Sequence, residues 1–136
     1  MTLSWGLIGG GEGSQIGGAH RIAARQDDAF RLSAGALDAD AKRARAFALR
    51  LGIPADRAYG DWREMLEGER ARADRIVLVT VATPNSSHFE ITCAFLRAGF
   101  DVLCEKPLTT TTEEAEEIVR TAREQGRICA VNYCYS

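Results

Sequence analysis

The sequence lacks the features that mark several classes of protein. No apolar run approaches the ~20 residues needed to span a bilayer, so we expect no membrane partner. Its 17 basic and 19 acidic side chains leave a net charge of −2, which provides no broad basic surface for nucleic acid. Residues 1–5 do not form a basic segment followed by an apolar one, as a secretory signal would. These absences predict a cytoplasmic protein.

The sequence also shows no pattern for a metal or disulfide site. Its four cysteines form no C-x-x-C pair and have no nearby histidine at ligand spacing: Cys93, Cys104, Cys129 and Cys134. Cys104 and Cys129 lie in apolar runs, where a free thiol packs as a small hydrophobe. We therefore expect structural thiols and no metal; a redox or metal-binding role of the cysteines is the alternative. A chain of 136 residues can bury a core without such cross-links.

Apolar residues alternate between strand-like and helix-like spacing along the chain. Strands are expected at residues 3–8, 30–37, 76–82, 102–104 and 128–132. Helices are expected at residues 18–26, 40–51, 61–72, 87–98 and 112–125, with Asp61 and Thr112 as caps and Gly52, Gly99 and Gly126 at ends. This alternation predicts an α/β fold, a doubly wound parallel sheet, with residues 1–136 as one domain.

A glycine tract, GGGEGSQIGG at residues 9–18, follows the first predicted strand. Gly9 and Gly11 match the first two places of the dinucleotide fingerprint G-x-G-x-x-G, but Ser14 occupies the third. Gly17 can replace it if the loop is three residues longer, with a helix that starts near Gly18 and directs its N–H groups at a pyrophosphate. Cofactor contacts are expected from Gly9, Gly11, Glu12, Gly13, Ser14, Gln15, Ile16 and Gly17. A flexible turn without a ligand is the alternative.

The second predicted strand is followed by Asp38, which lies 21 positions after Gly17. An acid about 20 residues beyond the glycines binds the adenosine ribose hydroxyls. This favours NAD as the cofactor, because a 2′-phosphate would meet the negative charge. Two alternatives stay open: Asp38 can cap the next helix, and Lys42 or Arg43 can meet the 2′-phosphate of NADP.

Polar residues follow the third and fourth predicted strands, where ligands of parallel sheets bind. After the third strand, the residues that can hydrogen-bond a cofactor or cap the next helix are Thr83, Pro84, Asn85 and His88. We expect His88, in the first turn of a helix, to form local hydrogen bonds; catalysis is the alternative. After the fourth strand come Glu105, Lys106 and Pro107.

Three segments together resemble the nucleotide-binding half of the glucose-fructose oxidoreductase, inositol dehydrogenase and rhizopine catabolism (Gfo/Idh/MocA) family. They are residues 9–20, 82–88 and 102–108, and the similarity extends over essentially the whole chain in the same order. The E-K-P sequence after a buried strand is the specific mark. The resemblance implies a Rossmann domain that binds NAD or NADP, and reversible oxidation of a hydroxyl group on a sugar, cyclitol or related polyol.

The resemblance also implies roles for individual residues. Lys106 is expected in the active site, beside the nicotinamide and the reacting hydroxyl. An ammonium there stabilises negative charge that develops on oxygen and can relay a proton. A cis peptide bond is expected before Pro107. Without the resemblance, Lys106 would be interpreted as a solvated lysine at the end of a strand.

Members of this family continue into a second α/β domain that binds substrate, forms oligomers and provides a proton-accepting histidine. The sequence ends at Ser136. We therefore expect the cofactor-binding domain of an oxidoreductase that is a homo-oligomer when complete, and expect this chain alone to be inactive because the family's second domain is absent. The alternative is a stand-alone module that binds or senses NAD(H) without doing chemistry.

Overall fold

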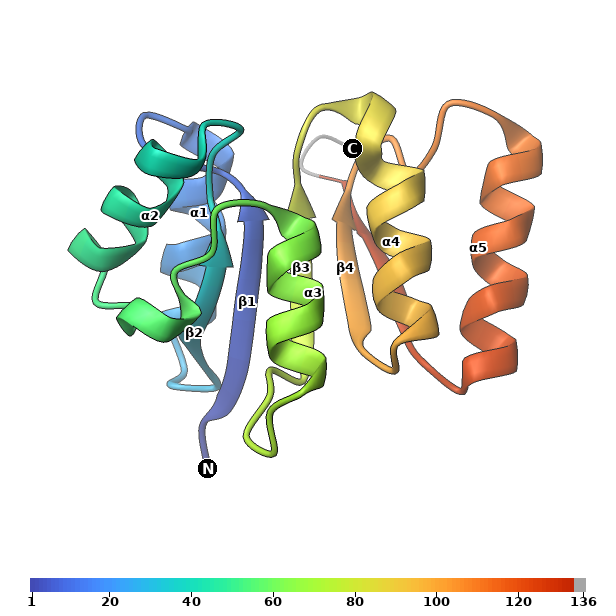
Figure 1. The fold of residues 1–136 in the computed structure, drawn as a ribbon. Helices are drawn as coiled ribbons and strands as arrows, with labels where there is room; N and C mark the ends of the chain where they lie inside the picture. Colours follow the sequence, from blue (N-terminus) through green and yellow to red (C-terminus); the bar gives the residue numbers. More distant parts are fainter. Residues whose placement is uncertain (134–136) are drawn as a thin grey trace.

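The computed structural model describes residues 1–133, and five parallel strands form one sheet in the order β2-β1-β3-β4-β5 (Figure 1). The strands are β1 Leu3–Gly9, β2 Phe30–Ala36, β3 Leu78–Ala82, β4 Asp101–Glu105 and β5 Cys129–Asn132. The helices are α1 Gln15–Arg25, α2 Ala41–Arg50, α3 Trp62–Arg70, α4 His88–Arg97 and α5 Thr112–Gln125, with short 3-10 turns η1 Ala55–Arg57 and η2 Asn85–Ser87. The predicted doubly wound α/β fold is confirmed.

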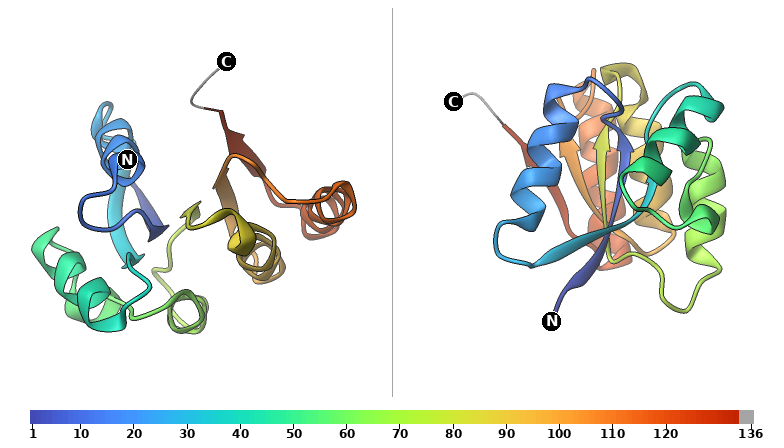
Figure 2. Two further views of the ribbon diagram at one scale, coloured as in Figure 1. Left: turned by 90° about the horizontal axis from the view of Figure 1, so that it is seen from above. Right: turned by 90° about the vertical axis from the view of Figure 1, so that its left-hand side faces the viewer.

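Helices cover both faces of the sheet (Figure 2). α3, α4 and α5 lie on one face, α1 lies on the other, and α2 lies beside β2. The larger buried cluster joins the sheet to the first group and includes Val79 and Phe95. The smaller cluster includes Leu7 of β1 and Ala48 of α2. Burial on both faces explains why the strands are continuous apolar runs rather than alternating ones.

A remnant of a further strand lies beside β2. Ala58 forms a parallel bridge with Gly35, and the N–H of Tyr59 donates to the Gly35 carbonyl at 2.9 Å. When this segment is counted as the third strand, the order becomes 3-2-1-4-5-6, which is that of dinucleotide-binding α/β domains. The sequence did not predict it, because a single bridge is shorter than any run that hydrophobic periodicity can detect.

A buried carboxylate anchors this remnant strand. Glu69 of α3 is fully buried and accepts two hydrogen bonds from the Arg57 guanidinium, at 3.0 and 2.7 Å. It also accepts the Tyr59 hydroxyl at 2.8 Å and the Ile76 N–H at 3.0 Å. Burial and the contact with Glu69 raise the pKa of Tyr59. The four hydrogen bonds tie η1, α3 and the approach to β3 together.

The start of α1 was predicted three residues too late. The helix begins at Gln15 instead of Gly18, because Ser14 is its N-cap and the Ser14 Oγ accepts the N–H of Gly17 at 3.1 Å. All other boundaries lie within two residues of the prediction. β3, for example, begins at Leu78 rather than residue 76, since the Ile76 N–H is bound by Glu69 instead of a neighbouring strand.

The predicted helix ends are otherwise close to those observed. Asp61 caps α3 as predicted, accepting the Glu64 N–H at 2.8 Å. The cap of α5 is Thr111 instead of Thr112, because the Thr111 hydroxyl reaches the Glu114 N–H at 3.2 Å. The left-handed glycines that follow helices are Gly52, Gly99 and Gly126.

The cysteines in the described part of the chain are free thiols. Cys93 and Cys104 are buried and Cys129 is half-buried. Burial raises the pKa of Cys104 to about 12 and that of Cys129 to about 11, so both thiols are uncharged at neutral pH. The expected structural role fits these three residues, whereas Cys134 lies outside the described residues.

Residues 1–133 contain neither a membrane-spanning helix nor a cluster of metal-ligating side chains. No helix there is long and apolar enough to cross a membrane. No group of three or more histidine, cysteine, aspartate or glutamate side chains in the same residues could hold a metal ion.

Candidate functional site

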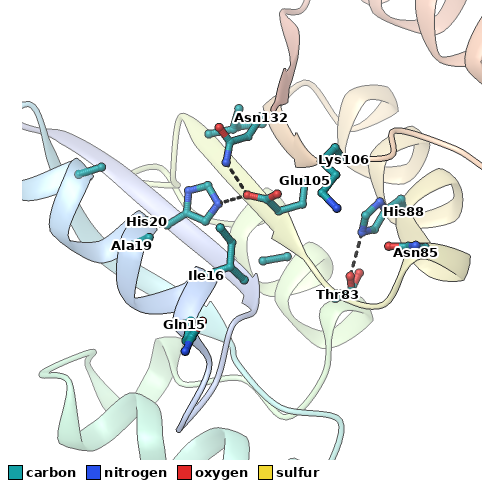
Figure 3. A pocket seen from close by; sticks show the side chains of 13 residues that line it. Gln15, Ile16, Ala19, His20, Thr83, Asn85, His88, Glu105, Lys106 and Asn132 are labelled. Atoms are coloured by element: carbon teal, nitrogen blue, oxygen red, sulfur yellow. Dashed lines mark hydrogen bonds and ion pairs between the residues drawn. The ribbon is translucent and has the colours of Figure 1, made fainter. Parts of the chain in front are cut away.

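Two adjoining clefts lie at the carboxyl ends of the strands. β1 lies between β2 and β3, so the order of the strands reverses beside it, and ligands of open parallel sheets bind at such a reversal. The lysine cleft has a volume of about 760 Å³ and lies between α1 and the ends of β3 and β4; its polar lining includes His20, Glu105 and Lys106 (Figure 3). The aspartate cleft, of about 430 Å³, is lined by Asp38 and lies at the ends of β1 and β2.

The clefts share Ala82 and Thr83 in their walls. Gly9 and Gly10, at the start of the loop between β1 and α1, line the aspartate cleft, and the first turn of α1 lines the lysine cleft. This loop packs too closely for side chains at two positions. A Cβ on Gly11 would lie 2.3 Å from the Leu37 carbonyl oxygen, and a Cβ on Gly17 would lie 2.1 Å from the Gly10 carbonyl oxygen. Positive φ angles occur at Gly9, Gly10 and Gly13. Gly17 therefore provides close packing of helix against loop, as a third glycine should, but from inside the first turn of α1.

The first turn of α1 offers main-chain N–H groups to a ligand. Gln15 and Ile16 are its first two residues and line the lysine cleft. Their N–H groups have no intrahelical partner and lie at the positive end of the helix dipole. The Gly17 N–H is bound by Ser14. The amides at the N-terminus of α1 are therefore those of Gln15 and Ile16, not those near Gly18, where the sequence placed the expected phosphate site.

The side chain of Glu12 lies outside both clefts. Its carboxylate pairs with Arg50 of α2. The guanidinium groups of Arg50 and Arg21 lie 5.3 and 5.4 Å from the centre of the Phe47 ring, and Arg21 also donates to the Gly10 carbonyl at 3.2 Å. These contacts fix the loop, and they leave only the main chain of Glu12 for the predicted cofactor contact.

Asp38 follows β2 and lies in a network of hydrogen bonds. It accepts the Asp40 N–H at 2.9 Å and the Arg43 guanidinium at 3.1 and 3.3 Å. The hydrogen bond from Arg43 and that from the Asp40 N–H lower the pKa of Asp38. The cap of α2 is Asp40, which accepts the Arg43 N–H at 2.9 Å, so the alternative that Asp38 caps this helix is wrong.

Three side chains form a hydrogen-bonded group in the lysine cleft (Figure 3). Glu105 Oε1 lies 2.6 Å from His20 Nε2 and 2.6 Å from Asn132 Nδ2. Burial alone would raise the pKa of Glu105, but the hydrogen bonds from Asn132 and His20 outweigh it and lower the pKa. His20 and Asn132 were not among the predicted site residues. The position of His20 in the segment that resembles the family was the available signal.

Lys106 lies directly after this group and is exposed to the cleft. The Lys106–Pro107 peptide bond is cis, as the resemblance implied. Figure 3 shows the Lys106 side chain between Glu105 and His88. Its ammonium has no hydrogen-bond partner among residues 1–133, so it is available to a bound molecule.

His88 is the first residue of α4 and only 1 % exposed. Its Nδ1 lies 2.7 Å from the Pro107 carbonyl oxygen, and its Nε2 lies 2.8 Å from the Thr83 carbonyl oxygen. This is the local hydrogen bonding expected of it. Asn85 and Thr83 line the lysine cleft, and Pro84 lines the aspartate cleft, so the structure brings the predicted residues after β3 to both sites.

Comparison with known proteins also points to a dinucleotide-binding domain. The sequence model of the Gfo/Idh/MocA oxidoreductase family, NAD-binding Rossmann fold, matches residues 3–133. The oxidoreductase YfiI of Bacillus subtilis (strain 168) is 46 % identical over 135 residues, which cover 98 % of this chain and 34 % of YfiI. Levoglucosan dehydrogenase of Pseudarthrobacter phenanthrenivorans is 32 % identical over 142 residues, which cover 99 % of this chain and 34 % of that enzyme.

A solved structure is similarly close. The crystal structure of an inositol dehydrogenase homolog from Azotobacter vinelandii, complexed with NADH and myo-inositol, matches with a TM-score of 0.95 at 47 % identity. The match covers 98 % of this chain and 35 % of that one, so the chain spans about a third of the length of its relatives. By sequence and by fold, the chain belongs to the Gfo/Idh/MocA oxidoreductase family, whose NAD-binding Rossmann fold it has.

Proposed function

We propose that residues 1–136 are the dinucleotide-binding domain of an NAD(P)-dependent oxidoreductase. The reaction is hydride transfer between nicotinamide and a hydroxyl or carbonyl group of a sugar, cyclitol or related polyol. One observation carries this proposal: the amide-bearing first turn of α1 lies beside two adjoining clefts, one with a carboxylate and one with an unpaired lysine. Relatives named levoglucosan dehydrogenase and scyllo-inositol 2-dehydrogenase (NADP(+)) support the substrate class.

The residues of the two clefts suit the two halves of a dinucleotide. Asp38 would accept hydrogen bonds from ribose hydroxyls in the aspartate cleft. The N–H groups of Gln15 and Ile16 would bind the pyrophosphate. Thr83 and Asn85 would orient the nicotinamide half in the lysine cleft. A bound nicotinamide supplies the hydride acceptor or donor, and the side chains around it supply position and charge.

Lys106 is the proposed catalytic residue. Its ammonium would stabilise the negative charge that develops on the reacting oxygen and would hold or relay the proton of the hydroxyl. Glu105 lies next to it and is held by His20 and Asn132, so its carboxylate is fixed on the opposite side of the cleft from His88. We propose that this chain alone binds cofactor without turnover, because a substrate site and a proton acceptor are family features of the second domain.

The geometry at Asp38 favours NAD over NADP. Its carboxylate is charged, and Arg43 is already engaged by it. Relatives use both cofactors, since one match was solved with NADH and another is named for NADP(+). Calorimetric titration with NADH and NADPH tests the binding role. We expect wild type to prefer NADH and Asp38→Ala to lose that preference. An unchanged ratio would remove Asp38 from the ribose site, and no heat with either cofactor would refute the proposed function.

Turnover in the complete gene product tests Lys106. Lys106→Ala should lower kcat by about 10²–10⁴-fold, the range for a general acid or base, while NADH affinity stays close to that of wild type. Arg123→Ala, on the exposed face of α5, is the matched control and should leave both values unchanged. Near-normal turnover by Lys106→Ala would refute the assignment.

The homo-oligomeric state and the cytoplasmic location stay predictions.

A further inference from the structure

We propose that His88 is a positioning residue: a buried imidazolium that donates from both ring nitrogens and thereby fixes the turn that carries Lys106. The effect on turnover rests on the proposed function of Lys106, whereas the charge state of the ring does not.

Both hydrogen-bond partners of His88 are main-chain carbonyl oxygens, which can only accept. Nδ1 lies 2.7 Å from the Pro107 oxygen and Nε2 lies 2.8 Å from the Thr83 oxygen. A neutral imidazole has one N–H and one lone pair, so it satisfies one of these carbonyls and faces the other with a lone pair. With 1 % of the residue exposed, no solvent relieves such a contact. The doubly protonated ring satisfies both partners.

Burial, the helix dipole and the Lys106 ammonium oppose the positive charge. His88 is the first residue of α4, where the helix dipole disfavours a cation. The two carbonyl dipoles point their negative ends at the ring and offset this effect, because hydrogen bonds from a charged donor are stronger than neutral ones. The other titratable side chains that line the cleft are His20, Glu105 and Lys106. Of these, the carboxylate of Glu105 favours the imidazolium and the Lys106 ammonium opposes it.

The two carbonyls belong to the two segments that frame the lysine cleft. Thr83 follows β3, and Pro107 comes directly after Lys106 at the end of β4. Ser87, the residue before His88, donates to Thr83 Oγ1 at 2.6 Å and strengthens the same junction. Since Pro107 is held from its carbonyl, the adjacent Lys106 main chain has little freedom, and the ammonium is confined to the cleft. A neutral ring would release one side of this clamp.

Nitrogen NMR tests the charge state directly. The chain has two histidines, so a ¹⁵N-histidine sample gives two sets of ring signals, and those of His88 disappear in His88→Gln. At neutral pH we expect both nitrogens of His88 to show the shift and the proton coupling of N–H groups. One unprotonated ring nitrogen in folded wild type would overturn the proposal, even if the protein binds cofactor.

Kinetics of the complete gene product test the positioning role. His88→Leu removes both donors, and we expect kcat to fall about a hundredfold, as for a catalytic group displaced by an ångström, with the NADH Kd changed less than about threefold. His88→Gln keeps one donor at a time and should fall between Leu and wild type. Glu90→Gln is the control. Glu90 lies in the same turn of α4 as His88, and the substitution breaks only an exposed ion pair with Arg63 of α3.

Three outcomes separate the possibilities. If His88→Leu is folded and keeps kcat within about threefold of wild type, the positioning role is refuted. If His88→Leu does not fold, the comparison of His88→Gln with Glu90→Gln decides: equal kcat values refute the role, and a lower kcat for His88→Gln supports it. If wild type shows no turnover and no cofactor binding, the proposed function has failed, while the NMR result still decides the charge of the ring.

Discussion

At the scale of single residues, the contact between Gly10 and Gly17 sets how closely α1 approaches its loop. A Cβ on Gly17 would lie 2.1 Å from the Gly10 oxygen and 2.6 Å from its carbonyl carbon. These are backbone atoms, so they cannot rotate away as a side chain would. At Gly18 the nearest atom to an added Cβ is Arg21 Nη2, at 3.8 Å, which is ordinary contact. Two neighbouring glycines in one helix therefore differ in what they tolerate.

We expect Gly17→Ala to lower the free energy of unfolding by roughly 1–3 kcal/mol, the usual cost of overpacking, and to weaken NADH binding because α1 must move off the loop. Gly18→Ala is the matched control. It should be neutral or stabilising by about 0.5–1 kcal/mol, since alanine is the better helix former. Urea unfolding and calorimetry measure both effects. Equal stability of Gly17→Ala and wild type would contradict the close approach of Gly17 to the Gly10 carbonyl.

The sequence predicted a closely packed glycine at Gly17 but placed it before the helix, whereas it lies inside the first turn of α1. The strict spacing from Gly9 and Gly11 places Ser14 at the third position, and Gly17 was identified as the third glycine on the assumption of a longer loop followed by a helix. The helix start was wrong because the fingerprint alone does not say which polar residue caps the helix, and Ser14 does so inside the tract. His20 and Asn132 were missed for another reason: they meet Glu105 across 85 and 27 positions of sequence, and only the sheet brings them together.

At the scale of elements, the alternation between strand-like and helix-like spacing of apolar residues was sufficient to predict the five strands of the sheet and the five α-helices. The remnant strand was not predicted, because it is held by side chains rather than by a ladder of main-chain hydrogen bonds. Arg57 and Tyr59 both bind Glu69 of α3, and this pairing is visible only when η1 and α3 are placed against each other. Such polar contacts between buried elements leave no periodic signal.

The anchor of the remnant strand gives a prediction for α3. Glu69→Ala removes both hydrogen bonds between the buried Arg57 guanidinium and the Glu69 carboxylate and leaves Arg57 only its longer contacts with Asp74. We expect a loss of about 3–5 kcal/mol in the free energy of unfolding. Glu67→Ala, two positions earlier, removes only an exposed pair with Arg70 and should change it by less than about 0.5 kcal/mol. Thermal and urea unfolding of both variants compare the two. Similar losses for both would show that Glu69 is not the anchor.

At the scale of the whole molecule, we expect the pH range of stability to depend on the titratable groups whose pKa in the folded chain differs from the ordinary value. The carboxyl groups whose pKa is lowered are Asp38, Asp56, Asp74 and Glu105. The thiols whose pKa is raised by burial are Cys93, Cys104 and Cys129. A lowered carboxyl pKa stabilises the fold above the unfolded value, and this contribution is lost as pH falls through the folded value. A raised thiol pKa stabilises the fold below the unfolded value. This contribution is lost as pH rises, because the thiols of the unfolded chain ionise at a lower pH than those of the folded chain.

From the carboxyl and thiol groups alone, we expect the free energy of unfolding to be highest between about pH 4.5 and pH 8.5, the range between their ordinary values, and to fall on either side. The proposed charged His88 adds a contribution that is complete below about pH 6.5 and is lost as pH rises above it. Urea unfolding across this range measures the profile, and Glu105→Gln should make its acid side shallower, since it removes one of the titrating groups. A profile that stays flat well below pH 4 would contradict the carboxyl shifts.

The shared wall of the two clefts has a consequence for ligands of different length. Because Ala82 and Thr83 border both hollows, a molecule that fills one of them carries any tethered second moiety to the mouth of the other. The second half then binds at an effective concentration set by the tether rather than by the bulk solution. Mononucleotides offered separately would lack this chelate advantage, so we expect the domain to discriminate by molecular span as well as by functional groups.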